Sequence, residues 1–330
     1  MKNHENIYIN GAWVPSGGDG SIDVMNPSTE EIVGSIPDGV ASDVNAAVEA
    51  ARAAFPSVTR EVVTPVAARD GTPLHVRDWG EGAPMVFVHA WALNAGMWDY
   101  QTAFFGNHGY RCVSYDRRGH GRSGIPSGGY DADTLADDLA SVIEARNLTG
   151  VTLVGHSMGG GEVVRYLARH GSSRIARVVL LAPVLPFLMK TADNPEGIDL
   201  TMIEAVRDMW RKDFPGWIVA NQRPFVVAGT SDGMIQWLTQ MMLGCPLHVA
   251  LACNRTVAET DYRPDLAKIG VPTLLIHGDA DASAPLPLTG ARAATMIPEC
   301  DFRVYESAPH GLFVTHAERV NADILGFMEP

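Results

Sequence analysis

The chain has 330 residues, of which 46% are hydrophobic and 19% are charged, and its formal net charge is -13. This composition supports a sizeable core and excludes an intrinsically disordered protein, and the negative charge argues against a nucleic-acid partner. The first residues lack the basic and apolar regions of a signal peptide. The longest apolar run, residues 178–189, contains prolines and is shorter than the roughly 20 residues that span a membrane. We therefore expect a soluble, cytoplasmic protein without membrane association.

Residues 1–57 predict a small appendage that consists of a hairpin and a helix. Asn10 and Gly11 lie in the middle of a short apolar stretch and suit a type I′ turn, in which both central residues need positive φ. A further strand is expected at residues 32–36, and Ser42 is predicted to cap the helix. The apolar face of that helix comprises Val44, Ala47, Val48, Ala51 and Phe55.

This appendage resembles the N-terminal end of an aldehyde dehydrogenase over about 57 residues, where the resemblance stops. The catalytic cysteine, the glutamate base and the cofactor-binding region of that family come later in its chain, so the resemblance implies no dehydrogenase activity here. Eight acidic and two basic residues give the segment a net charge of -6, and so short a piece is marginally stable alone. We favour a homo-oligomer in which it contacts a neighbouring subunit. A fusion remnant without function and an active-site cover are the alternatives.

From residue 60 to residue 330, strands alternate with helices, which predicts an α/β fold whose mostly parallel sheet is covered on both faces. Residues 61–67 and 74–78 are expected to form a leading antiparallel pair across a turn at Asp70 and Gly71. Six parallel strands are expected to follow and to complete an eight-stranded sheet. They are residues 85–89, 111–115, 151–154, 178–181, 273–276 and 302–305.

The interval from about residue 186 to 269 is too long for a simple crossover between two strands. It is expected to fold into short helices that are broken at Pro215, Pro224 and Pro246. We interpret it as a helical cap. Most of its many aromatic and methionine side chains should form the core of that cap, and a few should line an apolar acyl pocket.

Gly155, Ser157 and Gly159 form the motif Gly-x-Ser-x-Gly between the apolar residues 151–154 and a helix-like stretch at 160–170. This frame predicts a nucleophile elbow, a turn so sharp that the serine takes a strained backbone conformation. A Cβ at either glycine would collide with nearby backbone. We therefore expect Ser157 to be a nucleophile at the positive end of the following helix.

A base and an acid follow the serine in the order that such an elbow requires. Asp281 comes after the strand at residues 273–276, and His310 comes after the strand at residues 302–305. Because catalytic groups of open α/β sheets gather beyond the carboxyl ends of the strands, Ser157, Asp281 and His310 should converge. Asp279 is the alternative acid, although we expect it to stabilise the turn.

The region from about 60 to 330 resembles an α/β-hydrolase of the non-haem chloroperoxidase and arylesterase branch. The resemblance implies that Ser157 is the nucleophile, Asp281 the acid and His310 the base. It further implies that the backbone N–H groups of Trp91 and Met158 bind the oxyanion. The matching segments are residues 86–89 (Val-Phe-Val-His), 115–123 (Tyr-Asp-Arg-Arg-Gly-His-Gly-Arg-Ser), 155–169, 276–281 (Ile-His-Gly-Asp-Ala-Asp) and 308–312 (Ala-Pro-His-Gly-Leu).

Two departures from the family pattern lie beside the expected oxyanion hole. The family usually has glycine where this chain has Ala90, and many members have proline where it has Ala92. Family members often accept hydrogen peroxide in place of water, and Ala92 leaves open whether this chain does so.

The predicted function is that of a serine carboxylesterase, an enzyme that hydrolyses small aryl or short-chain alkyl esters through an acyl-enzyme. A lactonase or an acyltransferase with the same triad is the first alternative, and a non-catalytic ligand-binding protein on the same fold is the second. Neither a cofactor nor a metal is predicted, because the four cysteines form no Cys-x-x-Cys motif and the histidines show no metal-ligand spacing. Residues 116–123 are expected to form a structural loop.

Overall fold

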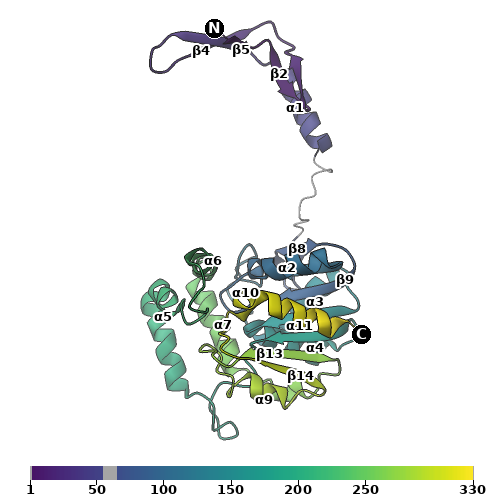
Figure 1. Cartoon of the computed structure of the whole chain (residues 1–330), viewed down its shortest axis with the longest axis vertical. Coiled ribbons are helices and arrows are strands. Elements are labelled where there is room, and N and C mark those ends of the chain that lie inside the picture. The colour runs from purple at the N-terminus through teal and green to yellow at the C-terminus, as the bar shows by residue number, and fades with distance from the viewer. Residues whose placement is uncertain (1, 55–64, 330) are drawn as a thin grey trace. The chain divides into compact units, whose positions relative to one another are not determined.

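The chain divides into two units, residues 1–60 and residues 61–330. The computed structural model describes residues 2–54 and 65–329 (Figure 1). No helix in these two described ranges is long and apolar enough to cross a membrane.

The predicted hairpin of the N-terminal unit is confirmed. Strands β2 (Asn6–Ile9) and β3 (Ala12–Pro15) pair antiparallel. Asn10 and Gly11 join them with φ values of 53° and 79°, the positive values that a type I′ turn requires. A separate three-stranded sheet has β5 (Ile32–Pro37) in its middle, between β1 (Lys2–Asn3) and β4 (Ser21–Met25).

The helix of this unit, α1 (Ala41–Ala54), begins before the predicted cap at Ser42. The Asp43 carboxylate in its first turn accepts from the N–H of Val40, the residue before the helix, at 3.0 Å and from the N–H of Gly17 at 2.8 Å. The predicted cap was wrong because the helix already begins at Ala41, so that Ser42 lies within its first turn.

The described part of the second unit has a seven-stranded sheet, not the predicted eight-stranded one, in the order β14-β13-β12-β11-β9-β10-β8. All neighbours are parallel except β8 and β10. The strands are β8 (Val76–Trp79), β9 (Ala83–Val88), β10 (Tyr110–Tyr115), β11 (Val151–His156), β12 (Ile175–Leu181), β13 (Thr273–Gly278) and β14 (Cys300–Tyr305).

The missing strand belongs to the predicted leading pair. Residues 61–64 lie outside the described residues, and β6 (Val66–Ala67) pairs only with β7 (Pro73–Leu74) in a two-stranded ribbon. His75 separates β7 from β8 because its N–H donates to the Ser123 hydroxyl at 2.8 Å and its carbonyl accepts from the N–H of Asp116 at 2.9 Å. β8 then continues into the main sheet.

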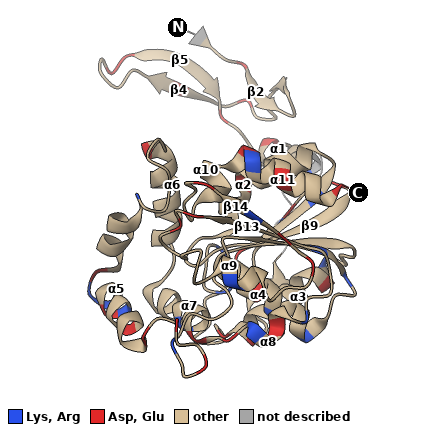
Figure 2. Cartoon of the chain, turned by 60° about the horizontal axis from the view of Figure 1, so that its bottom comes forward, with Lys and Arg blue, Asp and Glu red and all other residues tan. Residues whose placement is uncertain are grey.

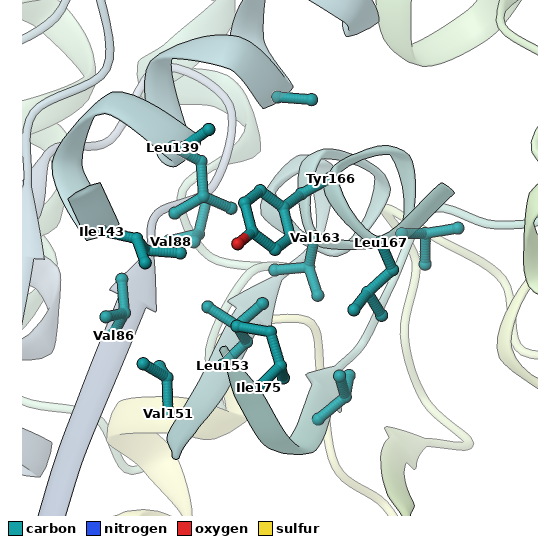
Figure 3. Close-up of a cluster of buried hydrophobic side chains, with 14 of the residues drawn as sticks. Val86, Val88, Leu139, Ile143, Val151, Leu153, Val163, Tyr166, Leu167 and Ile175 are labelled. Atoms are coloured by element: carbon teal, nitrogen blue, oxygen red, sulfur yellow. The ribbon is translucent and has the colours of Figure 1, made fainter. Parts of the chain in front are cut away.

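The sheet is covered on both faces, and β9 shows how its residues are shared between them. Val86 and Val88 point into one buried cluster, while Met85 and Phe87 belong to another, as the alternation of side chains along a strand requires. Helices α3 (Ala132–Ala145) and α4 (Met158–His170) complete the first cluster (Figure 3). The second is completed by 3₁₀ helix η2 (Ala95–Trp98) and helices α2 (Asp99–Asn107), α10 (Leu312–Thr315) and α11 (Ala317–Met328).

Charged residues of this unit lie on its helices and loops and on strands β8, β10, β12 and β14. Figure 2 shows them on α3 and on other helices of the second unit, whereas β9 and β13 carry none. The short helix α9 (Gly290–Ala294) contacts β13. Strands β9, β11 and β13 thus contain no charged residue.

Four helices lie between β12 and β13, in the interval that was predicted to form a cap. They are α5 (Leu200–Asn221), α6 (Asp232–Leu243), α7 (Leu247–Glu259) and α8 (Arg263–Leu266). All three predicted prolines lie at or near breaks between helical segments. The helical path of α5 is interrupted at Asp213 (φ -158°, ψ 78°), two residues before Pro215, and α7 begins after Pro246. Pro224 lies in the connection between α5 and α6.

Candidate active site

Ser157 stands at the junction of β11 and α4, in the elbow that the sequence predicts. Its φ of 55° and ψ of -119° form a strained conformation for a residue with a side chain. Its N–H donates to the carbonyl of Leu181 at 3.0 Å, which ties the turn to the neighbouring strand. A Cβ on Gly155 would lie 2.7 Å from the carbonyl oxygen of Gly159, and one on Gly159 would lie 2.3 Å from that of Val88. The elbow therefore needs both glycines.

The three predicted triad side chains lie within hydrogen-bond distance of one another. His310 Nε2 is 2.9 Å from Ser157 Oγ, and His310 Nδ1 is 2.6 Å from Asp281 Oδ2. Each residue is only 5% exposed. They come from the ends of β11, β13 and β14, which meet at one edge of the sheet. The arrangement can transfer a proton from the hydroxyl to the imidazole.

The carboxylate of Asp281 is held in place by more than His310. Its Oδ1 accepts from the N–H groups of Ser283 and Ala284 at 2.9 and 2.7 Å, and its Oδ2 lies 3.2 Å from His277 Nε2. Burial opposes ionisation, but the charge of His310 and these hydrogen bonds together hold the pKa of Asp281 well below its ordinary value. An ionised Asp281 assigns the proton on His310 to Nδ1 and leaves Nε2 free to accept from Ser157.

Asp279, the alternative acid, has a different partner. Its Oδ1 accepts from the N–H of Ser307 at 2.6 Å, and its own N–H donates to the carbonyl of Tyr305 at 3.1 Å. These bonds join the turn after β13 to the turn after β14. His310 is thus paired with Asp281, and Asp279 fixes the backbone around the pair.

Two aromatic rings hold His310 from the sides. His156 Nε2 is 2.9 Å from the carbonyl oxygen of His310. Burial, followed by the charge of His310, lowers the pKa of His156 to about 3, so this ring is neutral at neutral pH. Phe225, which follows α5, packs its ring 5.5 Å from that of His310, and its carbonyl accepts from the N–H of Gly311 at 2.8 Å. Sequence reasoning missed the contact of Phe225 with His310.

Trp91 and Met158 carry the two candidate oxyanion donors. Met158 is the first residue of α4, where the free N–H groups of a helix give a partial positive charge, and Trp91 follows β9 in the loop before η2. Within the described part of the chain, neither backbone N–H has an acceptor. The Trp91 side chain donates to the carbonyl of Ala250 on α7 at 2.8 Å and stacks on Trp210 of α5. Two cap helices therefore hold the residue that bears one candidate donor.

Two surface cavities are formed by described residues away from the triad. One, of about 600 Å³, lies between α2 and α6 and is lined by Tyr100 and Trp237 among others. The second, of about 240 Å³, is adjacent, and Ser231 and Met234 line both cavities. Neither cavity is lined by a triad residue, so the acyl pocket that we expect from the sequence stays a prediction.

A mainly parallel sheet with an elbow serine, a histidine and an aspartate at the ends of its strands defines an α/β-hydrolase. In agreement, residues 83–317 match the alpha/beta hydrolase fold family, and the chain belongs to that family. Residues 13–70 match the aldehyde dehydrogenase family, which agrees with the resemblance of the N-terminal segment.

Similar proteins cover nearly the whole second unit. A non-haem chloroperoxidase from Streptomyces lividans is 38% identical over 282 residues, which cover 80% of this chain and 99% of that protein. A bifunctional esterase/perhydrolase from Acinetobacter calcoaceticus is 36% identical over 275 residues, or 80% of this chain and 98% of that protein. The crystal structure of a bromoperoxidase from Bacillus anthracis is 36% identical with a TM-score of 0.77, and the match covers 81% of this chain and all of that one.

Proposed function

We propose that this protein is a serine carboxylesterase that hydrolyses small carboxylic esters through an acyl-enzyme intermediate. The observation that carries the proposal is the hydrogen-bonded series Ser157, His310 and Asp281, with distances of 2.9 and 2.6 Å. A nucleophile within reach of a base that is oriented by a third group is the arrangement that acyl transfer needs.

In the first half of the reaction, Ser157 Oγ attacks the ester carbonyl carbon while His310 Nε2 takes the hydroxyl proton. Asp281 stabilises the imidazolium that forms. The N–H groups of Trp91 and Met158 donate to the developing oxyanion, and one such donor is worth about 3–4 kcal/mol in the transition state. His310 then returns the proton to the leaving alkoxide, so that the alcohol departs and the acyl-enzyme remains.

In the second half, His310 takes a proton from water, whose oxygen attacks the acyl carbon. This attack forms a tetrahedral intermediate. Its collapse breaks the bond to Ser157 Oγ, His310 returns the proton to that oxygen, and the carboxylic acid is released. Hydrogen peroxide in the place of water would give a peroxycarboxylic acid by the same steps. The similarity to a protein named esterase/perhydrolase supports ester cleavage as the main reaction, with perhydrolysis as a side reaction.

The test of this proposal is the Ser157→Ala variant. Removal of the nucleophile should lower kcat by about a millionfold, because a triad without its nucleophile retains only the oxyanion hole and binding. Hydrolysis of a panel of aryl, alkyl and lactone esters is measured for the wild-type protein and the variant. Ser141→Ala is the matched control, because that hydroxyl donates only to the carbonyl of Asp137 in its own helix.

Retention of more than a trace of ester hydrolysis by folded Ser157→Ala would show that the nucleophile is misassigned. Covalent labelling of Ser157 by a fluorophosphonate separates an esterase from a non-catalytic binding protein. A marked preference for lactones in the panel would favour the lactonase alternative with the same triad.

A further inference from the structure

Two buried side chains of opposite charge, Arg117 and Glu162, connect the loop of Trp91 to the helix of Met158. Arg117 follows β10, Glu162 lies in the second turn of α4, and their side chains are 0% and 1% exposed. Arg117 Nε donates to Glu162 Oε2 at 2.7 Å. The Tyr115 hydroxyl donates to the other oxygen of the same carboxylate. Both carboxylate oxygens of Glu162 therefore have donors, and the pair has no access to solvent.

The guanidinium of Arg117 also reaches the loop before Trp91. Its Nη2 donates to the carbonyl of His89 at 2.7 Å, and its Nη1 lies 3.4 Å from the carbonyl oxygen of Ala90. The Arg117 backbone N–H donates to His89 Nε2 at 2.9 Å, which leaves the proton of this ring on Nδ1, 2.7 Å from the same Ala90 oxygen. The carbonyl of Ala90 is thus held by two donors.

This carbonyl matters because it shares a peptide plane with the N–H of Trp91. In a trans peptide the C=O and the following N–H point in opposite directions within one plane. Any group that fixes the direction of the Ala90 carbonyl therefore also fixes the direction of the Trp91 N–H. On the other side, Glu162 belongs to the same rigid helix as Met158, whose N–H is the second candidate donor.

We propose that Arg117 and Glu162 form a positioning clamp, which sets the distance and the direction of the Trp91 and Met158 N–H groups relative to each other. The proposal rests on the proposed esterase function. Arg117 suits the role because its planar fork can bind one carboxylate and two backbone carbonyls at the same time, which a lysine ammonium on its flexible stem cannot do.

Stability alone is a weak reason for this pair. Burial raises the pKa of Glu162 well above its ordinary value and lowers that of Arg117 to about 10, so the protein interior opposes both charges. An apolar pair of similar volume is often as stable as a buried ion pair. The placement of the pair between the loop of Trp91 and the helix of Met158 gives it a positioning role instead.

The chain offers a matched control in the next residue. Arg118 forms a second buried ion pair, with Asp138 on α3, at 2.6 and 2.7 Å. Its remaining nitrogen binds Asp70 at 2.8 Å, and it has no bond to the loop of Trp91. Asp138→Asn therefore disturbs a buried arginine of the same loop without touching the proposed clamp.

The test compares Glu162→Gln with Asp138→Asn on one ester and on its thiono analogue, in which sulfur replaces the carbonyl oxygen. Glu162→Gln should lower kcat for the oxygen ester by about tenfold or more and leave KM within about twofold, since loss of one oxyanion donor costs about a hundredfold or more. The ratio of oxygen-ester to thiono-ester turnover should fall with it, because sulfur accepts hydrogen bonds weakly. Asp138→Asn should change neither the ratio nor kcat.

A second comparison separates positioning from folding. Arg117→Met leaves a buried carboxylate without its partner and should lower the melting temperature strongly, whereas the double variant Arg117→Met with Glu162→Met removes both charges and should recover most of it. The clamp predicts that the double variant keeps the low kcat and the low ester ratio despite this recovery.

A double variant with wild-type kcat, or a Glu162→Gln variant that behaves like Asp138→Asn, overturns the clamp while the esterase function stands. A wild-type protein that hydrolyses no ester of the panel overturns the proposed function, and the clamp falls with it.

Discussion

At the residue scale, Asp281 shows how one carboxylate can set the chemistry of a site. Two backbone N–H groups bind one of its oxygens, and the rings of His277 and His310 lie against the other. The backbone bonds fix the carboxylate plane, so the ring of His310 has one favourable orientation. A group held in this way costs no reorganisation when the imidazolium forms.

Asp281→Asn should therefore impair turnover far more than Asp279→Asn. An amide at position 281 can donate to His310 Nδ1, which favours the wrong tautomer and costs about ten-thousandfold in kcat in a comparable triad. An amide oxygen at position 279 can still accept from the N–H of Ser307, so this variant should retain most of its activity. Steady-state kinetics on one ester ranks the two, and the reverse order would show that Asp279 is the acid.

The elbow could be predicted from the sequence because its constraints are local, whereas the clamp joins residues that are distant along the chain. The strain at Ser157 and the close approaches at Gly155 and Gly159 are local, so the motif itself records them. Arg117 and Glu162 meet only because β10 and α4 lie side by side in the fold. The available signal was a charge in the helix after the elbow, among residues that otherwise suit a buried position, and this signal names no partner.

At the scale of elements, the loop between β9 and η2 connects the cap to the candidate oxyanion hole. Its Trp91 side chain is held by α5 and α7, and its Ala92 has a φ of 59°, which is uncommon for a residue with a side chain. Movement of the cap helices would therefore be transmitted to the Trp91 N–H. The loop also contains Ala90 and Ala92, where the resemblance implies glycine and proline.

Ala92→Pro should raise the ratio of perhydrolysis to hydrolysis. A proline ring locks φ near −65°, which is incompatible with the observed value of 59°, so the peptide between Trp91 and position 92 must rotate. The Trp91 carbonyl can then turn towards the site and accept a hydrogen bond from peroxide. Peracid and acid are measured at fixed peroxide concentration. Ala92→Gly is the control, because glycine tolerates positive φ. An equal ratio of perhydrolysis to hydrolysis in both variants would refute the expectation.

Element types were easier to predict than element boundaries. The cap helices follow from prolines that interrupt an amphipathic stretch, and two of the breaks lie at or near Pro215 and Pro246. The division between β7 and β8 at His75 could not be predicted. The backbone of His75 is bound by Asp116 and Ser123, which follow the distant strand β10. Such tertiary hydrogen bonds leave no local pattern in the sequence.

At the scale of the whole molecule, the N-terminal unit differs from the hydrolase unit in its surface. Its strand β4 is exposed throughout and lies at the edge of its sheet. An open edge with exposed apolar side chains is a surface that pairs readily with another chain. The exposed large apolar residues of this unit are Tyr8, Trp13, Ile22, Val24, Met25, Ile32, Val33, Ile36, Val44 and Val48.

We infer that this unit is non-catalytic and that it contacts a neighbouring copy of the chain. Every proposed catalytic residue lies in the hydrolase unit, and the match to the aldehyde dehydrogenase family ends at residue 70. So small a unit cannot form a core large enough to bury these apolar side chains. A second copy supplies the same open edge strand, and two such edges can pair about a twofold axis.

Deletion of residues 1–57 should accordingly spare ester hydrolysis and lower the mass of the assembly in solution. The expected kcat and KM are those of the full chain, because no proposed catalytic residue is removed. Light scattering on the full-length and truncated proteins measures the mass. A charged substitution on the exposed edge, Val24→Lys, provides a second variant that keeps the chain length and should also dissociate the assembly.

Equal masses for all three proteins, with equal activity and equal Tm, would contradict the assembly role and leave a fusion remnant without function. A large loss of kcat in the truncated protein alone would instead favour the active-site cover.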